Sequence, residues 1–183
     1  MLFKDTPAGF GLISRLNHWL MAVVIVAMFA LGWWMVGLDY YSPYYNSAPD
    51  LHRSVGIILL AALIFRILWR LANVNPVDAE LTAFERTASR LVQWGFYPLL
   101  LALLVSGYLI STPDGRPIDV FGVFQVPSLI QGKGITDAAG FVHKYLSYST
   151  MALALVHTVA ALKHHIIDKS SILTRMWSGP PSA

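Results

Sequence analysis

The chain of 183 residues contains no cysteine. This absence excludes disulfide bonds, iron–sulfur clusters held by thiolates, and haem attached covalently through a C-x-x-C-H motif. Haem held without a covalent bond is not excluded by it, because histidine alone can ligate the iron.

Charged residues are also scarce. They make up 13% of the chain, whereas 56% of the residues are hydrophobic, a composition typical of a small membrane protein rather than of a soluble domain. The net charge of +3 would suit a nucleic-acid ligand if the basic residues formed a patch, but they are scattered among apolar runs. We therefore expect no nucleic-acid partner and a single membrane-embedded domain over residues 1–183.

Four apolar runs are long enough to cross a lipid bilayer, which takes about 20 residues at a rise of about 1.5 Å each. They lie near residues 16–38, 52–72, 90–111 and 138–163. The first run is longer than a signal-peptide core and lacks a small-residue cleavage site, so we interpret it as a retained anchor. The sequence predicts an all-α fold, an integral membrane four-helix bundle whose one extended loop spans residues 111–134.

Lysine and arginine are distributed unevenly between the two ends of this bundle. Nine belong to the end that carries both termini, and four belong to the other end. These four are Arg53, Arg116, Lys133 and Lys144. Because basic segments stay on the cytoplasmic side of a membrane, we expect both termini in the cytoplasm and the long loop outside.

Four of the six histidines fall at two matched depths of the bundle. His18 and His157 lie toward the inner face, and His52 and His143 lie toward the outer face. His143 and His157 are 14 residues apart, which is about 21 Å of helix and returns the side chain to within about 40° of the same face. Each level therefore offers two imidazoles from different helices. Gly32, 14 residues beyond His18, leaves the first helix bare at the outer level.

Two opposed imidazoles can ligate the iron of a b-type haem from both sides. We predict two haem b groups, an outer one on His52 and His143 and an inner one on His18 and His157, forming a path for electrons across the membrane. Structural zinc fits less well, because each level supplies two imidazoles and zinc usually takes four ligands. A purely structural role of the histidines and a haem-free transporter remain as alternatives.

Several polar residues lie close to these two levels. Arg66 is 14 residues beyond His52, at the inner level, where it could meet a haem propionate or a quinone oxygen. Arg53 and Lys144 could do the same at the outer level, and snorkelling to the interface is the alternative for Arg66. We interpret His164 and His165 as interfacial residues, with His164 as the one substitute for His157.

Five stretches of the sequence carry a resemblance to a known family, namely SRLNHWLMAVVIVA, LHRSVGIILLAALIFRILWRL, LLVSGYLIS, GRPIDVFGVFQVP and FVHKYLSYSTMALALVHTVAALKHHIIDKSSILTRM. They resemble the bacterial cytochrome b561 proteins, small four-helix dihaem cytochromes of the inner membrane. The resemblance implies a multi-pass protein of the bacterial inner membrane, with haem ligands at His18, His52, His143 and His157. It also implies electron transport with quinone and, for part of the family, oxidation of superoxide to dioxygen with reduction of ubiquinone.

The direction of electron flow and the external partner have alternatives. A superoxide substrate favours a positive outer surface, yet the four outer basic residues face five aspartates, a net charge of about −1. These are Asp39, Asp50, Asp114, Asp119 and Asp137. A quinol-linked reductase of an external acceptor, or a cytochrome b anchor subunit that accepts electrons from a docked dehydrogenase, would fit the same helices.

Overall fold

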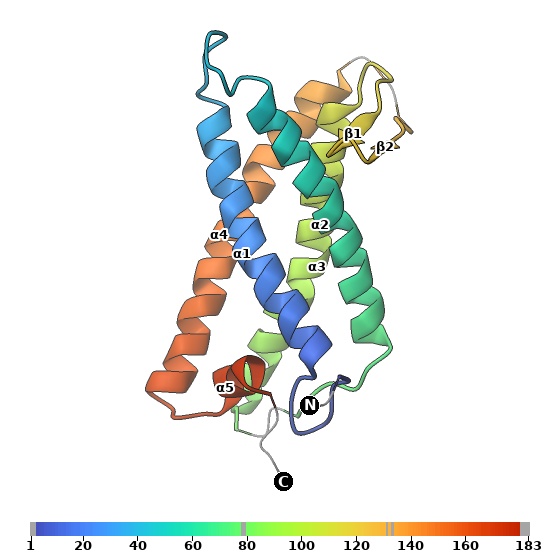
Figure 1. Ribbon diagram of the computed structural model, residues 1–183. Helices are drawn as coiled ribbons and strands as arrows, with labels where there is room; N and C mark the ends of the chain where they lie inside the picture. The colour runs from blue at the N-terminus through green and yellow to red at the C-terminus, as the bar shows by residue number, and fades with distance from the viewer. Residues whose placement is uncertain (1–2, 78–79, 131, 133, 180–183) are drawn as a thin grey trace.

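Four long helices make up most of the protein. The computed structural model describes residues 3–77, 80–130, 132 and 134–179. The helices are α1 (Leu12–Met35), α2 (Ser47–Leu71), α3 (Ala83–Ser111), α4 (Ile135–Ile166) and the short α5 (Ile172–Trp177) (Figure 1). The first four are long and apolar enough to cross a membrane. The expected all-α membrane bundle is confirmed, although each long helix begins several residues before its apolar run.

Polar caps account for two of these early helix starts. The Asp5 carboxylate accepts hydrogen bonds from the Gly11 N–H and the Ser14 hydroxyl, both at 2.8 Å, which satisfies polar groups at the start of α1. Thr82 and Glu85 form a capping box, in which the Glu85 N–H donates to Thr82 Oγ1 at 3.3 Å and the Thr82 N–H donates to the Glu85 carboxylate at 3.1 Å. This box starts α3 at the first polar turn rather than at the apolar run.

Two short elements lie outside the predicted helices. The loop between α3 and α4 contains an antiparallel hairpin of β1 (Ile118–Val120) and β2 (Phe124–Val126). Its turn uses positive φ angles at Phe121 and Gly122. The helix α5 follows α4 and lies at the same end of the bundle as the N-terminal segment, opposite the hairpin (Figure 1). Strands of three residues and a helix of six are too short to give a periodic sequence signal.

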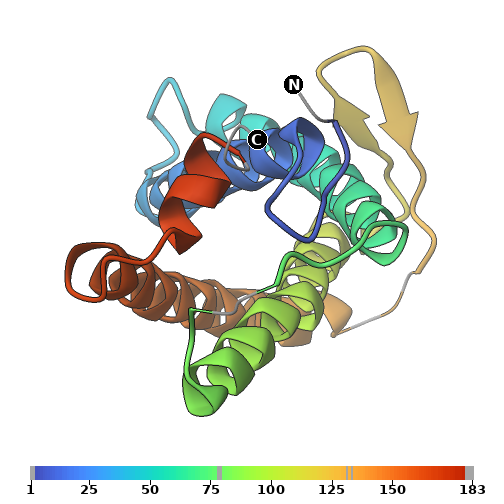
Figure 2. The ribbon, with the colours of Figure 1, turned by 90° about the horizontal axis from the view of Figure 1, so that it is seen from below.

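The helices form a ring in which α4 stands apart from α1 and α2. Helix α2 packs against α1 and α3, and α3 packs against α4. Seen from below, α1 and α2 lie on one side and α3 and α4 on the other, with α5 crossing this end (Figure 2). Over the described residues, the backbone of α4 approaches α3 and α5 closely but barely approaches α1 or α2. A space therefore separates the backbone of α4 from those of α1 and α2, and the side chains that enter this space determine what it can hold.

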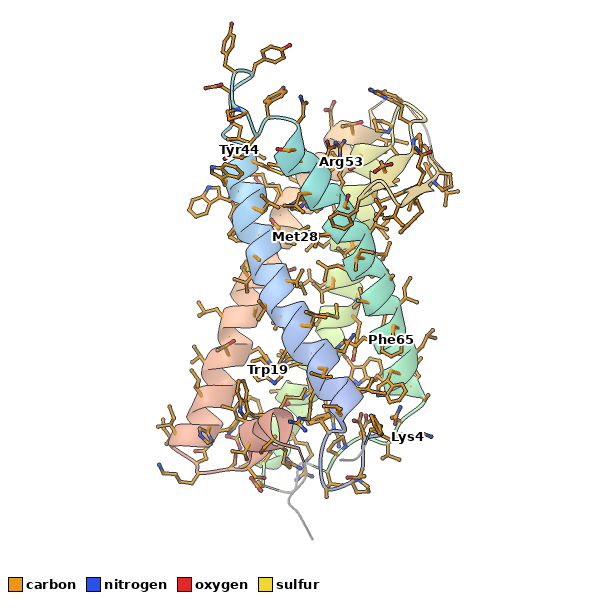
Figure 3. The ribbon with its side chains drawn as sticks, in the orientation of Figure 1. Lys4, Trp19, Met28, Tyr44, Arg53 and Phe65 are labelled. Carbon is orange, nitrogen blue, oxygen red and sulfur yellow. The ribbon has the colours of Figure 1, made fainter. Side chains whose placement is uncertain are left out.

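Only a thin apolar core joins the helices. It consists of Met21, Met28, Leu59, Leu63 and Leu100. Most other large apolar side chains point outward, as expected where lipid rather than water surrounds a helix. Figure 3 places Trp19 and Lys4 toward one end and Tyr44 and Arg53 toward the other, which fixes the two levels of the neighbouring His18 and His52.

Candidate functional site

His52 on α2 and His143 on α4 face each other at the end of the bundle that carries the hairpin. Their ring centroids are 6.2 Å apart and their planes differ by 75°. Each ring lies against a glycine of a neighbouring helix. A Cβ on Gly32 would lie 3.2 Å from Cε1 of His52, and a Cβ on Gly107 would lie 3.0 Å from Cε1 of His143. The missing side chains let both rings approach the helix backbones closely.

The ring nitrogens of this pair, named the outer pair after its predicted side of the membrane, differ in their partners. His143 Nδ1 lies 2.9 Å from the Leu103 carbonyl oxygen and 3.3 Å from the Ser106 hydroxyl. Because a carbonyl can only accept a hydrogen bond, Nδ1 of His143 carries the proton and Nε2 keeps its lone pair. His52 Nδ1 is buried and has no hydrogen-bond partner within the described ranges. His52 therefore lacks the acceptor that His143 has, and Gly32 lies beside its Nδ1.

His18 on α1 and His157 on α4 form the second pair, toward the end that carries α5, and this pair and end are named inner after their predicted side of the membrane. Their ring centroids are 6.4 Å apart, with planes at 73°. The Phe96 ring packs on His157, with centroids 5.8 Å apart. Arg66 on α2 reaches the same place, since its Nη2 lies 3.4 Å from His18 Nδ1 and its Nη1 donates to Asn17 Oδ1 at 3.2 Å. The guanidinium expected at the inner level is therefore in contact with one of the two histidines.

Both pairs border cavities inside the bundle. The inner one has a volume of about 420 Å³ and is bordered by His18, His157, Arg66, Gln93 and Tyr97 among mostly apolar side chains. Residues of α5 also border it. The outer cavity, which both His52 and His143 border, is smaller, at about 60 Å³. A volume of several hundred Å³ with few polar groups is typical of a cofactor or small-molecule site.

The spacing of the rings fits a metal held between two imidazoles. A metal–nitrogen bond of about 2.0 Å, with about 1.1 Å from the nitrogen to the ring centre, separates two ligating rings on opposite sides by about 6.2 Å. The observed separations are 6.2 and 6.4 Å. Neither pair has a third histidine or carboxylate close enough to share a metal among the described residues. The donor set therefore fits a haem, which brings its own equatorial nitrogens, and does not fit structural zinc.

The other predicted outer residues lie on the surface. Arg53 is exposed and forms an ion pair with Asp50. Lys144 is exposed and forms no ion pair within the described part of the chain. Neither residue lines the outer cavity, and Lys133 lies outside the described residues. The structure thus brings Arg66, but not Arg53 or Lys144, to a histidine pair.

His164 belongs to a separate polar cluster near the inner end. Its Nδ1 lies 2.7 Å from the Asp168 carboxylate. The Lys163 ammonium bridges Asp168 at 2.7 Å and Glu85 at 2.8 Å. The hydrogen bonds from Lys163 and then His164 lower the pKa of Asp168. His164 does not line the inner cavity, so the geometry favours the interfacial interpretation of this residue.

Sequence reasoning did not find every residue of the site. Gly107 stands in the stretch LLVSGYLIS without a spacing that ties it to a histidine. Asn17 precedes His18 directly, and its contact with Arg66 depends on how α1 and α2 pack. The Leu103 carbonyl has no sequence signal, because every residue carries this acceptor.

The four membrane-crossing helices bring two pairs of histidines face to face, and a cavity of cofactor size borders His18 and His157. This arrangement is that of a haem-binding membrane cytochrome. The chain belongs to the prokaryotic cytochrome b561 family, whose sequence profile matches residues 9–179. The resemblance noted from the sequence is thereby confirmed. The protein is accordingly a haem b electron-transfer protein with several spans in the bacterial inner membrane.

Three curated relatives extend this likeness over almost the whole chain. Cytochrome b561 homolog 2 of Escherichia coli K12 is 46% identical over 180 residues, covering 96% of this chain and 95% of that protein. The probable superoxide oxidase CybB of Yersinia pestis is 25% identical over 162 residues, covering 87% and 90%. Cytochrome b561 homolog 1 of Escherichia coli K12 is 24% identical over 164 residues, covering 87% and 91%.

Proposed function

We propose that this cytochrome holds two haem b groups and moves single electrons between the outer face of the membrane and the quinone pool. The outer group is held by His52 and His143, and the inner group by His18 and His157. The observation that carries the proposal is the pair of ring separations, 6.2 and 6.4 Å, with α4 supplying one histidine to each level. The haems supply one-electron transfer, while the chain fixes their depth and their surroundings.

The proposed reaction takes electrons from superoxide and gives them to ubiquinone. Two superoxide ions each lose one electron and become dioxygen, and ubiquinone takes up the two electrons with two protons to become ubiquinol. The name of the Yersinia pestis relative, probable superoxide oxidase, supports this substrate. The expected orientation, with both termini in the cytoplasm, supports the direction, because the outer pair then faces the side opposite the basic end.

Residues of the inner cavity are suited to an oxygen-bearing ligand. Arg66, Gln93 and Tyr97 border it with donor groups on two helices. Quinone carbonyl oxygens and haem propionates both accept hydrogen bonds from such donors. We infer that Arg66 donates to a quinone carbonyl oxygen, which leaves its positive charge in place, and that the remaining polar groups favour ubiquinone on this side of the bundle.

At the outer level, attraction of superoxide requires a local positive charge close to the histidine pair. The outer side as a whole carries a net charge of about −1 by sequence. Lys144 is adjacent to His143 in the chain and exposed, so we infer that it attracts superoxide toward this histidine. Arg53 contributes less, because Asp50 neutralises its charge.

Spectra and stopped-flow kinetics of the purified protein test the proposal. We expect a b-type absorption spectrum and two haems per chain by pyridine haemochrome. Mixing with superoxide should reduce the haems, and added ubiquinone should restore their oxidised spectrum while ubiquinol forms. His143→Ala, which lacks one outer ligand, should lose the fast reaction with superoxide. A haem-loaded protein that leaves superoxide untouched, or that co-purifies with a dehydrogenase as its electron source, would contradict the substrate.

A further inference from the structure

We propose that the groups around the two histidine pairs give the inner site a higher reduction potential than the outer site, with Arg66 as the residue that raises it. This inference rests on the proposed function, because it requires a haem at each pair. The residues that contact the histidine ligands would set this difference in reduction potential. The difference would give electron transfer across the membrane a direction, from the outer site to the inner site.

The inner pair has a cation beside it, inside the bundle. The Arg66 guanidinium is half-buried, lies 3.4 Å from His18 Nδ1 and is fixed by its hydrogen bond to Asn17. It forms no ion pair within the described ranges. In a medium of low dielectric constant, a positive charge repels a neighbouring positive centre strongly. It therefore favours ferrous over ferric iron, because the ferrous state carries one positive charge less. Arg66 therefore raises the potential of the inner site.

Arg66 also provides no hydrogen-bond acceptor for the ring N–H of His18, although a metal-binding histidine usually has one. An imidazole that binds a metal through one nitrogen carries a proton on the other, and an acceptor for that proton makes the ring a more basic ligand. Arginine has donors only, so Arg66 offers the Nδ1 side of His18 no acceptor. A less basic ligand stabilises ferric iron less, which again raises the potential of the inner site.

The outer pair differs at His143, which has an acceptor, whereas His52 Nδ1 has no hydrogen-bond partner within the described residues, like the Nδ1 side of His18. His143 Nδ1 donates to the Leu103 carbonyl at 2.9 Å, the type of bond that increases ligand basicity and stabilises ferric iron. The two nearby cations, Arg53 and Lys144, are exposed, and Arg53 is paired with Asp50. Water and salt screen such charges strongly. The outer site therefore has the lower potential, and an electron that enters there moves downhill to the inner site.

Potentiometric titration of the purified, haem-loaded protein tests this order without using its activity. We expect two one-electron midpoints. His143→Ala should retain only the inner haem, and its midpoint should match the higher of the two. Arg66→Gln should lower that higher midpoint by at least about 59 mV, which corresponds to a tenfold change in the equilibrium constant for one electron. The lower midpoint should not change. Arg66→Lys should restore most of the shift, because it keeps the charge.

Arg53→Gln provides the matched control, since it removes an arginine from the same helix at the other level. It should leave both midpoints within the error of the titration. An inner midpoint below the outer one, or an Arg66→Gln protein with two unchanged midpoints, would overturn the inference. If Arg66→Gln binds no inner haem, the comparison of the native protein with His143→Ala still decides the order. A native protein without any haem would instead refute the proposed function.

Discussion

His157 and His164 differ in what surrounds them, although they lie seven residues apart on one helix. His157 faces His18 and packs against Phe96, whereas His164 is held by Asp168. We therefore expect His157→Ala to carry one haem per chain instead of two, because a single axial histidine holds a haem weakly. Quantification by pyridine haemochrome measures this ratio.

His165→Ala is the control for that experiment. It changes a histidine next to His164 but none of the four facing rings, so both haems should remain bound. If His157→Ala kept two haems and His164→Ala lost one, the inner ligand would be His164 rather than His157.

Gly107 determines how closely the His143 ring approaches α3. A Cβ at this position would lie 3.0 Å from Cε1 and 3.2 Å from Nδ1 of the ring. Gly107→Ala should therefore displace the ring and weaken its hydrogen bond to Leu103, at a cost of about 1–3 kcal/mol for overpacking. We expect a shifted or partly lost outer haem, measured by low-temperature α-band spectra and by haem content.

Gly95 offers a matched control on the same helix, because a Cβ there meets nothing within 4 Å. Gly95→Ala should leave both haem spectra unchanged, and its stability should rise slightly if it changes at all. Equal effects of the two substitutions would show that helix propensity, rather than contact with His143, causes the change.

Helix α5 is tied to three other parts of the chain at the inner end. Trp19 Nε1 donates to the Met176 carbonyl at 3.0 Å. Arg175 Nη1 donates to the Val77 carbonyl at 2.9 Å. The Ser171 N–H and hydroxyl both donate to the Glu80 carboxylate at 2.7 Å. These bonds hold α5 across the cavity that His18 and His157 border.

The bond between Glu80 and Ser171 makes this arrangement sensitive to acid. Hydrogen bonds from the Ser171 hydroxyl and then its N–H lower the pKa of Glu80. A carboxylate with a lowered pKa contributes stability above its unfolded value of about 4.3, and this contribution is lost as the pH falls through the folded pKa. We expect α5 to be fixed at neutral pH and to gain mobility as the pH falls through the lowered pKa of Glu80. A nitroxide on a single cysteine at Ser178, followed by electron paramagnetic resonance, reports this mobility.

Glu80→Gln should increase the mobility of that label at neutral pH and remove most of its dependence on acid. A line shape that does not change throughout an acid titration in the native background would contradict a role of Glu80 in holding α5. Because the chain has no cysteine of its own, the label reports one position only.

The helices could be predicted from the sequence because apolar runs of bilayer length with few charges seldom occur outside membrane-spanning helices. The two histidine levels could be predicted because 14 residues return a side chain to nearly the same helix face. The start of α3 could have been predicted from the T-x-x-E pattern at Thr82 and Glu85. The hairpin and α5 could not, because tertiary contacts such as those of Ser54 with the hairpin backbone hold them.

The details that set the chemistry of the site were the least predictable. The spacing to Arg66 suggested its level, but its contact with His18 depends on how α1 and α2 are rotated. The acceptor of His143 is a backbone carbonyl at Leu103, and it is available to this ring only because α3 and α4 pack closely. Residue types and spacing encode neither of these relations.

The orientation of the whole molecule in the membrane is predicted from its charge distribution and can be measured directly. The positive-inside rule places α5 in the cytoplasm and the loop between α1 and α2, which contains Tyr41, outside. In intact spheroplasts, a membrane-impermeant maleimide should label Tyr41→Cys, whose position is 92% exposed in the native chain, and should leave Ser178→Cys unlabelled. Both should react after permeabilisation. The reverse pattern would place the outer pair in the cytoplasm and would remove the support for an external electron donor.

With that orientation, the rate of the proposed reaction with superoxide should depend on the electrostatic field at the outer face. Lys144 is exposed beside His143 and forms no ion pair within the described residues, so Lys144→Glu should slow haem reduction by superoxide several-fold at low ionic strength. The difference should shrink toward about 150 mM salt, where the Debye length is about 8 Å. Arg116→Glu changes the net charge equally but lies in the loop between α3 and α4, whereas Lys144 is next to His143 in the chain. It should therefore slow the reaction less. Equal slowing by both variants would show that total charge, rather than Lys144, attracts the anion.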